Sequence, residues 1–416
     1  MDDALSNEFD IVIAGAGMVG ATLACLLAES SLRIALIDRN PLVHGKDSDS
    51  PERRIDKFDP RVSAISQASQ QLFRALGVWE DMISARVCNY SAMQVWDAEG
   101  TGSIDFSAAE INQPELGSII ENSIIIAALH KRIAQLENVF PITPFTIESF
   151  EYIDRDGRSI VKLHADDGQA ICAPLVIAAD GANSKLRGLA NFECREWDYE
   201  QHALVTTVRT QRPHNNTALQ RFMETGPLAF LPLRAAQEDG VQHFCSIVWS
   251  MLPDQAEWVM SLSEDAFNAE LGAALESKLG VIEWSDKRFV FPLRQRHALD
   301  YVKESIVLVG DAAHTIHPLA GQGVNLGLLD AKALAEELQR GIKAGRSVAD
   351  PTVLLRYQRR RKGNNLSMMW LMEGFKRLFA QQDLGVRWLR NMGMSAVDKA
   401  GPIKNQLIRK AMGLDS

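Results

Sequence analysis

The sequence predicts an α/β protein with a Rossmann-like domain, an antiparallel β-sheet domain and a C-terminal helical segment. Three observations predict this fold. A strand, a Gly-rich turn and a helix open the chain, short strands recur between residues 200 and 293, and the pattern after residue 323 is helical. At roughly 150 residues per domain, the 416 residues indicate two to three domains, each with its own core.

The first unit is strand, turn, helix, strand, with glycines at a fixed spacing. The first glycine, Gly15, permits a tight turn, Gly17 lets a pyrophosphate approach the backbone, and Gly20 lets the helix pack closely. The helix N-terminus favours phosphates, and Asp38, 18 positions after Gly20, can accept hydrogen bonds from ribose hydroxyls. The unit predicts a dinucleotide site. Its elements are a strand at 9–14, a helix at 21–29 and a strand at 33–37.

The remaining elements follow from hydrophobic periodicity and turn residues. Up to residue 179 the pattern predicts a surface loop at 42–60, a helix at 66–76, a hairpin around Glu99 and Gly100, a helix at 123–136 capped by Asn122 or Ser123, and strands near 146–153, 158–164 and 171–179. Beyond it we expect strands at 203–210, 228–233, 244–249, 289–293 and 305–310, with helices near 264–278 and 323–340.

Two aspartates directly follow buried strands later in the chain. Asp180 precedes Gly181 after the strand expected at 171–179, and Asp311 follows Gly310 at the end of the strand expected at 305–310. A carboxylate at this position lies where ligands bind in open α/β sheets. Either aspartate alone could be a helix N-cap, but together with the Gly-rich turn they indicate one shared ligand site.

These motifs together resemble the single-component FAD-dependent aromatic hydroxylases, which have a para-hydroxybenzoate-hydroxylase-like fold. Residues 317–330 match the motif of the ubiquinone-biosynthesis hydroxylases at every defining position, and the resemblance runs essentially end to end. Within that family the chain is most similar to the bacterial hydroxylases that act at ring carbon 5 of a polyprenylphenol. Other matching segments are 59–66, 120–123, 197–199, 202–205, 245–250 and 406–414.

The resemblance implies a division into domains and roles for particular residues. FAD would bind to 1–86, 107–190 and 297–350, the substrate to 87–106 and 191–296, and 351–416 would be helical. Asp311 would bind the ribityl or pyrophosphate part of FAD, Arg61 would reach the pyrophosphate, and Asp180 would complete the site. The isoalloxazine edge would be contacted by Pro318 and by the backbone of Gly323, Val324 and Asn325. A helix N-terminus at Gly323 would favour the negative charge of reduced flavin.

The resemblance also implies a reaction. NAD(P)H would reduce the flavin, O2 would add at its C4a atom to give a hydroperoxide, and the electron-rich ring of a polyprenylphenol would take the distal oxygen. Only one Gly-rich unit is present, which fits transient binding of NAD(P)H, and the sequence does not separate NADH from NADPH. The side chains expected to line an apolar wall over the ring are Phe230, Pro232 and Phe291.

Other functions remain open at this stage. One is a flavin dehydrogenase or reductase that acts on an isoprenoid without inserting oxygen, and another is a scaffolding subunit of a quinone-synthesis complex. His314 is a candidate proton acceptor for the substrate phenol, although packing beside the flavin loop is the favoured interpretation. His314 and His317 lack an Asp, Glu or Cys cluster, so no metal site is expected, and hydrolase and Walker A motifs are absent from the sequence.

Composition and charge exclude further classes. The net charge of −9 argues against a nucleic-acid binder, and no apolar run reaches the length of a bilayer span. The acidic N-terminus lacks the layout of a signal peptide, and five scattered cysteines without a CxxC motif suit reduced thiols. We therefore expect a cytoplasmic protein.

The C-terminal region departs from this acidic balance. Residues 355–416 hold 13 basic and 4 acidic side chains, a net of +9, which leaves −18 on the other 354 residues. One helical face there is apolar, formed by Met368, Leu371, Met372, Phe375, Leu378 and Phe379. Basic side chains lie nearby, at Lys376, Arg377, Arg387 and Arg390. Packing on the body and docking to an anionic membrane or to a quinone-biosynthesis complex both remain open, as does a homo-oligomer.

Overall fold

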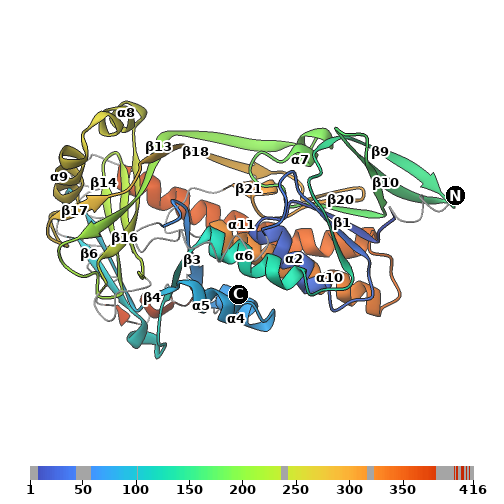
Figure 1. Cartoon of the computed structure of the whole chain (residues 1–416), viewed down its shortest axis with the longest axis horizontal. Coiled ribbons are helices and arrows are strands. Elements are labelled where there is room, and N and C mark those ends of the chain that lie inside the picture. The colour runs from blue at the N-terminus through green and yellow to red at the C-terminus, as the bar shows by residue number, and fades with distance from the viewer. Residues whose placement is uncertain are drawn as a thin grey trace.

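The computed structural model describes residues 8–43, 58–100, 102–235, 242–315 and 323–380, together with a few residues between 398 and 412. Most of the surface loop expected at 42–60 lies outside the described residues. The α/β class expected from the sequence is confirmed, with two large sheets, two small ones and a central group of helices (Figure 1).

The Gly-rich unit belongs to a six-stranded sheet with the order β19-β20-β12-β1-β2-β8. All neighbours are parallel except the edge pair β19 and β20. Its central strands are fully buried and apolar, as expected for a parallel sheet covered on both faces. The strands are β1 (Ile11–Ala14), β2 (Ile34–Ile37), β8 (Val139–Ile142), β12 (Leu175–Ala178), β19 (Val302–Lys303) and β20 (Ile306–Leu308).

Four helices run beside this sheet in the middle of the molecule (Figure 1). They are α2 (Met18–Leu27), α6 (Asn122–Ile133), α10 (Gly323–Lys343) and α11 (Pro351–Ala380). Shorter helices and turns are α4 (Gln67–Ala75), α5 (Trp79–Ala85), α7 (Lys185–Leu189), η1 (Ala108–Ile111) and η2 (Gly310–Ala312). None of the described helices is both long enough and apolar enough to span a bilayer.

The second large sheet has nine strands, in the order β21-β18-β13-β16-β15-β14-β5-β6, with β17 also paired to β13. It is antiparallel as expected, except that β14 and β5 run parallel. Helices α8 (Pro253–Ser261) and α9 (Glu264–Ala274) cover one face. The strands are β5 (Ala92–Asp97), β6 (Ser103–Ser107), β13 (Cys194–Thr210), β14 (Thr217–Met223), β15 (Gly226–Pro232), β16 (Phe244–Met251), β17 (Ile282–Ser285), β18 (Phe289–Ala298) and β21 (His314–Thr315).

Two three-stranded sheets complete the fold. The order β3-β7-β4 joins β3 (Val62–Ser66), β7 (Gly117–Glu121) and β4 (Cys88–Tyr90), and this sheet packs on the face of the nine-stranded sheet opposite α8 and α9. The order β11-β10-β9 joins β11 (Ala170–Ala173), β10 (Arg158–Ala165) and β9 (Ile147–Arg155) at the far end of the molecule (Figure 1). The division into domains stays a prediction.

Two local expectations were wrong. The run at 171–179 is not one strand, because it divides at Pro174 into β11 and β12, which pair in different sheets. Proline has no N–H to donate to a ladder, so a chain can leave one sheet there and enter another. Helix α6 is preceded by Glu121 without a side-chain cap, and Asn122 instead accepts a hydrogen bond from the Ser63 hydroxyl at 2.7 Å.

Candidate functional site

The Gly-rich turn needs glycine at two of its three positions. Gly15 has φ +106°, and a Cβ there would lie 2.3 Å from the carbonyl oxygen of Ala179. A Cβ at Gly20 would lie 1.9 Å from the Gly15 carbonyl oxygen, whereas one at Gly17 would meet nothing within 4 Å. Gly17 is the N-cap of α2, with no side-chain cap and no acidic residue in the first turn. The N–H groups of this helix end can therefore bind an anion.

Asp38 lies at the end of β2 beside this turn. Its Oδ2 atom accepts the N–H of Ala16 at 2.8 Å, and its Oδ1 atom accepts the N–H of Asn40 at 2.8 Å. The carboxylate is half-buried, and each oxygen has a second lone pair that a ribose hydroxyl can use.

One carboxylate oxygen of Asp180 accepts backbone hydrogen bonds, and the other has no partner among the described residues. Its Oδ2 atom accepts the N–H groups of Lys185 at 2.8 Å and Leu186 at 3.3 Å, so it helps to cap α7. Its Oδ1 atom is buried and has no hydrogen-bond partner in the described part of the chain. Burial raises the pKa of this carboxyl, and hydrogen bonds from Ser184 and from the backbone oppose the rise.

Arg187 connects the loop of Asp180 with the loop of Asp311. Its Nη1 donates to the carbonyl oxygen of Ala312 at 3.0 Å, and its Nη2 donates to that of Ala182 at 2.7 Å. The side chain is buried. Sequence reasoning missed this role, and the only available clue was an arginine three residues after the α7 N-cap, Ser184.

Asp311 reaches solvent although protein atoms surround most of it, and this burial raises the pKa of its carboxyl. Interactions with the nearby His314 and Arg61 side chains lower the pKa of the Asp311 carboxyl and so oppose the effect of burial. Arg61 is thus close enough to influence Asp311 across more than 200 residues of sequence. Its backbone N–H donates to Asp59 Oδ1 at 2.9 Å, and its carbonyl accepts the N–H of Asn122, so the segments at 59–66 and 120–123 meet here.

The start of α10 is fixed by the side chain of Asn325, which is only 4% exposed. Its Oδ1 accepts the N–H of Ser66 at 3.0 Å and the hydroxyl of Ser69 at 2.8 Å, and its Nδ2 donates to the carbonyl of Ala64 at 2.7 Å. These bonds anchor the helix end to β3 and α4. The backbone of Gly323, Val324 and Asn325 forms the first turn, while Pro318 lies outside the described residues.

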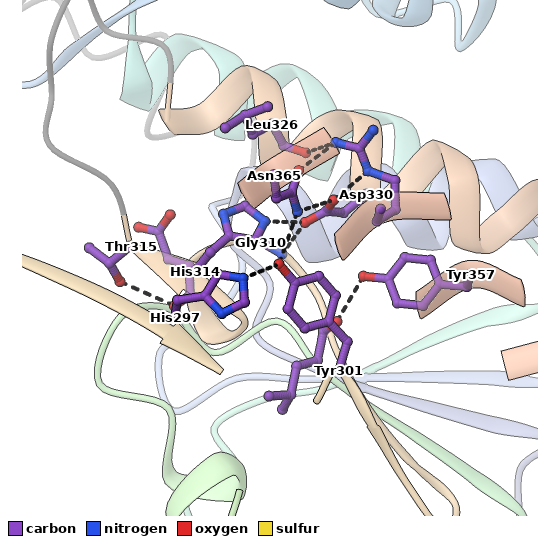
Figure 2. Close-up of polar contacts among 12 residues, drawn as sticks. His297, Tyr301, Gly310, His314, Thr315, Leu326, Asp330, Tyr357 and Asn365 are labelled. Carbon is purple, nitrogen blue, oxygen red and sulfur yellow. Dashed lines mark hydrogen bonds and ion pairs between the residues drawn. The ribbon is translucent and has the colours of Figure 1, made fainter. Parts of the chain in front are cut away.

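A buried polar network around Asp330 lies behind the Asp311 loop (Figure 2). Asp330 is fully buried, and its Oδ2 accepts the N–H of Gly310 at 3.1 Å and a bond from His314 Nε2. Its Oδ1 accepts Arg361 Nε at 2.7 Å and Asn365 Nδ2 at 3.1 Å. Burial raises the pKa of this carboxyl, but His314 and Arg361 outweigh that and hold the pKa at about 2. Asp330 is therefore an anion at neutral pH.

The hydrogen bonds around Asp330 extend through Tyr301 to His297 on β18. Because Asn365 Nδ2 donates to the hydroxyl of Tyr301 at 3.3 Å, that hydroxyl can donate onward to His297 Nε2, also at 3.3 Å. Burial, together with the nearby His314 and Lys362 side chains, lowers the pKa of His297 to about 4. A neutral His297 is thus the form that accepts from Tyr301.

The three side chains expected to line an apolar wall do not lie together. Phe230 is 0% exposed and packs with the cluster under α8 and α9, which includes Phe267. Pro232 is buried two residues further along β15. Phe291 is 41% exposed and pairs with Ala203, while its neighbour Val290 packs under α8 and α9. Since strand side chains alternate, Phe291 points to the opposite face.

Part of the basic C-terminal region packs on the body. Lys404 is buried, and its ammonium donates to Glu110 at 2.9 Å and to Asp398 at 3.0 Å. Met412 packs in a small cluster with Leu116. The apolar face expected at 368–379 and the cations at 376, 377, 387 and 390 lie where side chains are not described. Among described residues no cluster could hold a metal ion.

The donor and acceptor set fits FAD. The uncapped N-terminus of α2 suits a pyrophosphate, and the Asp38 carboxylate suits ribose hydroxyls. Asp180 Oδ1 and His314 Nδ1 are buried polar atoms without a partner among described residues, and both can accept hydrogen bonds.

Comparison with known proteins gives the same cofactor. Residues 8–368 match the FAD binding domain family. The 3-demethoxyubiquinol 3-hydroxylase of Escherichia coli strain K12 is 35% identical over 406 residues, which cover 97% of this chain and 98% of that protein. The ubiquinone hydroxylase UbiL of Rhodospirillum rubrum is 33% identical, covering 97% and 89%. The mitochondrial ubiquinone biosynthesis monooxygenase COQ6 of Danio rerio is 31% identical, covering 97% and 89%.

Solved structures share the fold at lower identity. The FAD-dependent monooxygenase pqsL of Pseudomonas aeruginosa superposes with a TM-score of 0.73 at 18% identity, covering 94% of this chain and all of that one. The p-nitrophenol 4-monooxygenase PnpA of Pseudomonas putida gives a TM-score of 0.72 at 18% identity, covering 98% of both chains.

Proposed function

This chain belongs to the FAD-dependent hydroxylases of ubiquinone biosynthesis, and from that premise we propose that it hydroxylates the aromatic ring of a polyprenylphenol with NAD(P)H and O2. The observation that carries the proposal is the end-to-end match to proteins named ubiquinone hydroxylases. We infer ring carbon 5 as the position, from the similarity of segments such as 197–199 and 245–250 to that subgroup.

When bound, FAD supplies electron transfer and oxygen activation, and the chain's own residues hold it in place. The N–H groups at the start of α2 would bind the pyrophosphate, and Asp38 would accept the ribose hydroxyls. Asp311 would face the ribityl chain, with Arg61 beside it. The first turn of α10, held by Asn325, would favour negative charge on the reduced flavin.

The substrate side would be built on the nine-stranded sheet. Phe291, half-exposed on the face away from α8 and α9, is the apolar side chain that we place against the substrate. Phe230 and Pro232 would act from behind by fixing β15. Apolar walls exclude water from the reacting centre, which limits side reactions of reactive intermediates.

A second ring position is favoured by one specific comparison. The relative from Escherichia coli is named for hydroxylation at position 3 of 3-demethoxyubiquinol, and it is 35% identical. Deletion of the gene distinguishes the two positions, because the intermediate that accumulates retains hydrogen at the carbon this enzyme attacks. Accumulation of 3-demethoxyubiquinol would overturn carbon 5, and intact ubiquinone synthesis would overturn the proposal as a whole.

Labelled oxygen gas separates this function from a flavin reductase that acts on an isoprenoid. The purified protein, given NAD(P)H and a polyprenylphenol under 18O2, should place the label in the product ring. Product formation without label would identify a reductase. A mainly scaffolding subunit would support ubiquinone synthesis even when FAD binding is abolished.

We also propose that the basic C-terminal region keeps the enzyme near its lipid-dissolved substrate, at an anionic membrane or in a quinone-biosynthesis complex. Its 13 basic and 4 acidic side chains, a net charge of +9, support this proposal. Lys404 is committed to Glu110 and Asp398, so the cations that would act are others in the region.

A further inference from the structure

His314 has one nitrogen committed and one unused. The ring is 1% exposed, and its Nε2 bonds to Asp330 while its Nδ1 is buried without a hydrogen-bond partner in the described part of the chain. Figure 2 shows this second nitrogen on the side of the ring that faces away from Asp330. Leaving a buried polar atom unpaired costs about 1–3 kcal/mol, so this nitrogen needs a partner beyond the residues that the structure describes.

The partner's chemistry follows from the tautomer. Asp330 is an anion, which accepts only, so Nε2 carries the hydrogen of that bond. Arg361 also pairs with Asp330, through a 2.7 Å bond from its Nε atom. Among the described residues, other charged or titratable groups that interact with this ring are Asp311, His297 and Tyr301. A neutral ring with hydrogen on Nε2 has a lone pair on Nδ1, and that nitrogen can only accept.

Because His314 Nδ1 acts as an acceptor, its partner in the ligand must be a hydrogen-bond donor. The phosphates of FAD accept hydrogen bonds and cannot satisfy this atom, whereas the hydroxyls of its ribityl chain can. His314 lies three residues after Asp311 on the same turn, which the proposed function places beside the ribityl chain. We propose that His314 Nδ1 accepts a hydrogen bond from a ribityl hydroxyl of FAD, with Asp330 as the positioning residue that fixes the tautomer.

Two residues of α11 extend this arrangement. Arg361 donates to Asp330 and, through Nη2, to Asn365 Oδ1 at 2.9 Å, and Asn365 donates to Asp330 in turn. The C-terminal helix thus holds the carboxylate that orients His314. The inference rests on the proposed function only in taking FAD as the ligand.

The first experiment measures the FAD dissociation constant of the apoprotein by quenching of flavin fluorescence. His314→Phe keeps a ring but loses the acceptor, and should weaken FAD binding about three- to tenfold, the equivalent of one neutral hydrogen bond. Asp330→Asn should weaken it similarly, because the Asn amide can donate to Nε2 and turn Nδ1 into a donor. The double variant should lose no more than either single one.

The second experiment identifies the ligand atom. FAD analogues that each lack the 2′, 3′ or 4′ ribityl hydroxyl are titrated into wild type and His314→Phe. One analogue should bind wild type about three- to tenfold more weakly than FAD, and that difference should vanish in His314→Phe. Equal discrimination by both proteins would overturn the inference. Failure of wild type to bind FAD at all would instead overturn the proposed function.

Two controls guard against a purely structural effect. Arg360→Met, on α11 next to Arg361, removes the ion pairs with Glu336 and Glu337 of α10, and should leave FAD affinity unchanged. The imidazole nitrogens of His314 in the wild-type holoprotein, read by 15N NMR, should show hydrogen on Nε2 and a lone pair on Nδ1. Hydrogen on Nδ1 would contradict the proposal even if the variants failed to fold.

Discussion

The guanidinium of Arg187 donates a 3.0 Å hydrogen bond to the carbonyl oxygen of Ala312, and this contact joins two loops that lie 125 residues apart in the chain. One loop carries Asp180 and the other carries Asp311. The relative position of the two carboxylates therefore depends on the side chain of Arg187, which lies between the two loops.

Arg187→Met should retain the aliphatic stem but leave the carbonyls of Ala312 and Ala182 without their donor. We expect a loss of about 1–3 kcal/mol in the free energy of unfolding, together with weaker FAD binding. Denaturant unfolding and flavin titration measure the two effects. Arg209→Met, which removes only an exposed pair with Glu283, is the control and should change stability by less than about 1 kcal/mol.

Valine substitutions at Gly17 and Gly20 should have different effects, the first on FAD binding and the second on stability. Gly17→Val has room for its side chain and an ordinary φ of −68°, so the protein should fold but lose FAD because the new side chain blocks the helix end. Gly20→Val collides with the Gly15 carbonyl and should lower the melting temperature. Thermal unfolding and flavin content after purification separate the outcomes. A yellow, stable Gly17→Val protein would contradict this assignment.

Asn325→Leu should destabilise the protein by about 2–4 kcal/mol, because it leaves Ser66, Ser69 and Ala64 without their buried partner. FAD affinity should fall as well, since the first turn of α10 loses its anchor. The matched control on the same helix is Gln339→Leu, which gives up a single bond to Leu26 and should cost under about 1.5 kcal/mol. Equal losses in both variants would count against an anchoring role.

His297 should make stability fall as the solution becomes acidic. Burial lowers the pKa of His297 from 6.5 to about 4 in the folded protein. Between these values the unfolded chain binds a proton that the folded chain does not, so stability decreases as pH falls from about 6.5 to about 4. The melting temperature of His297→Gln should therefore drop less between pH 7 and pH 5 than that of wild type. Equal drops in the melting temperatures of the two proteins would show that His297 does not cause the loss of stability.

Truncation should test the C-terminal region, with the end point chosen from the contacts of α11. Arg361, Asn365 and Met369 all pack on the body, so a chain that ends after residue 380 preserves them. Binding to vesicles with anionic lipids should weaken in the truncated protein while FAD content persists. Unchanged vesicle binding, measured by flotation at low salt, would show that the region only packs.

Much of the fold could be predicted from local sequence. The strand–turn–helix unit follows from apolar runs and from glycines that the backbone itself requires, as the contacts at Gly15 and Gly20 show. The prediction of one strand at 171–179 was wrong because the segment is apolar almost throughout. Only the strand pairing, of β11 with β10 and of β12 with β1, shows that Pro174 separates two sheets. Phe230, expected over the substrate, instead packs under α8 and α9, because a strand pattern in the sequence does not tell which face of the sheet the helices cover.

The family, the cofactor and the loops that carry Asp38, Asp180 and Asp311 follow from the sequence, because the motifs that indicate them each consist of residues close together in the chain. Tertiary structure alone decided how the loops are held. The Asp330 network draws Gly310, His314, Arg361 and Asn365 together, and Arg187 crosses to Ala312. Hydrogen bonds between distant segments leave no periodic pattern in a sequence, because they form only once packing has brought buried donors and acceptors within reach.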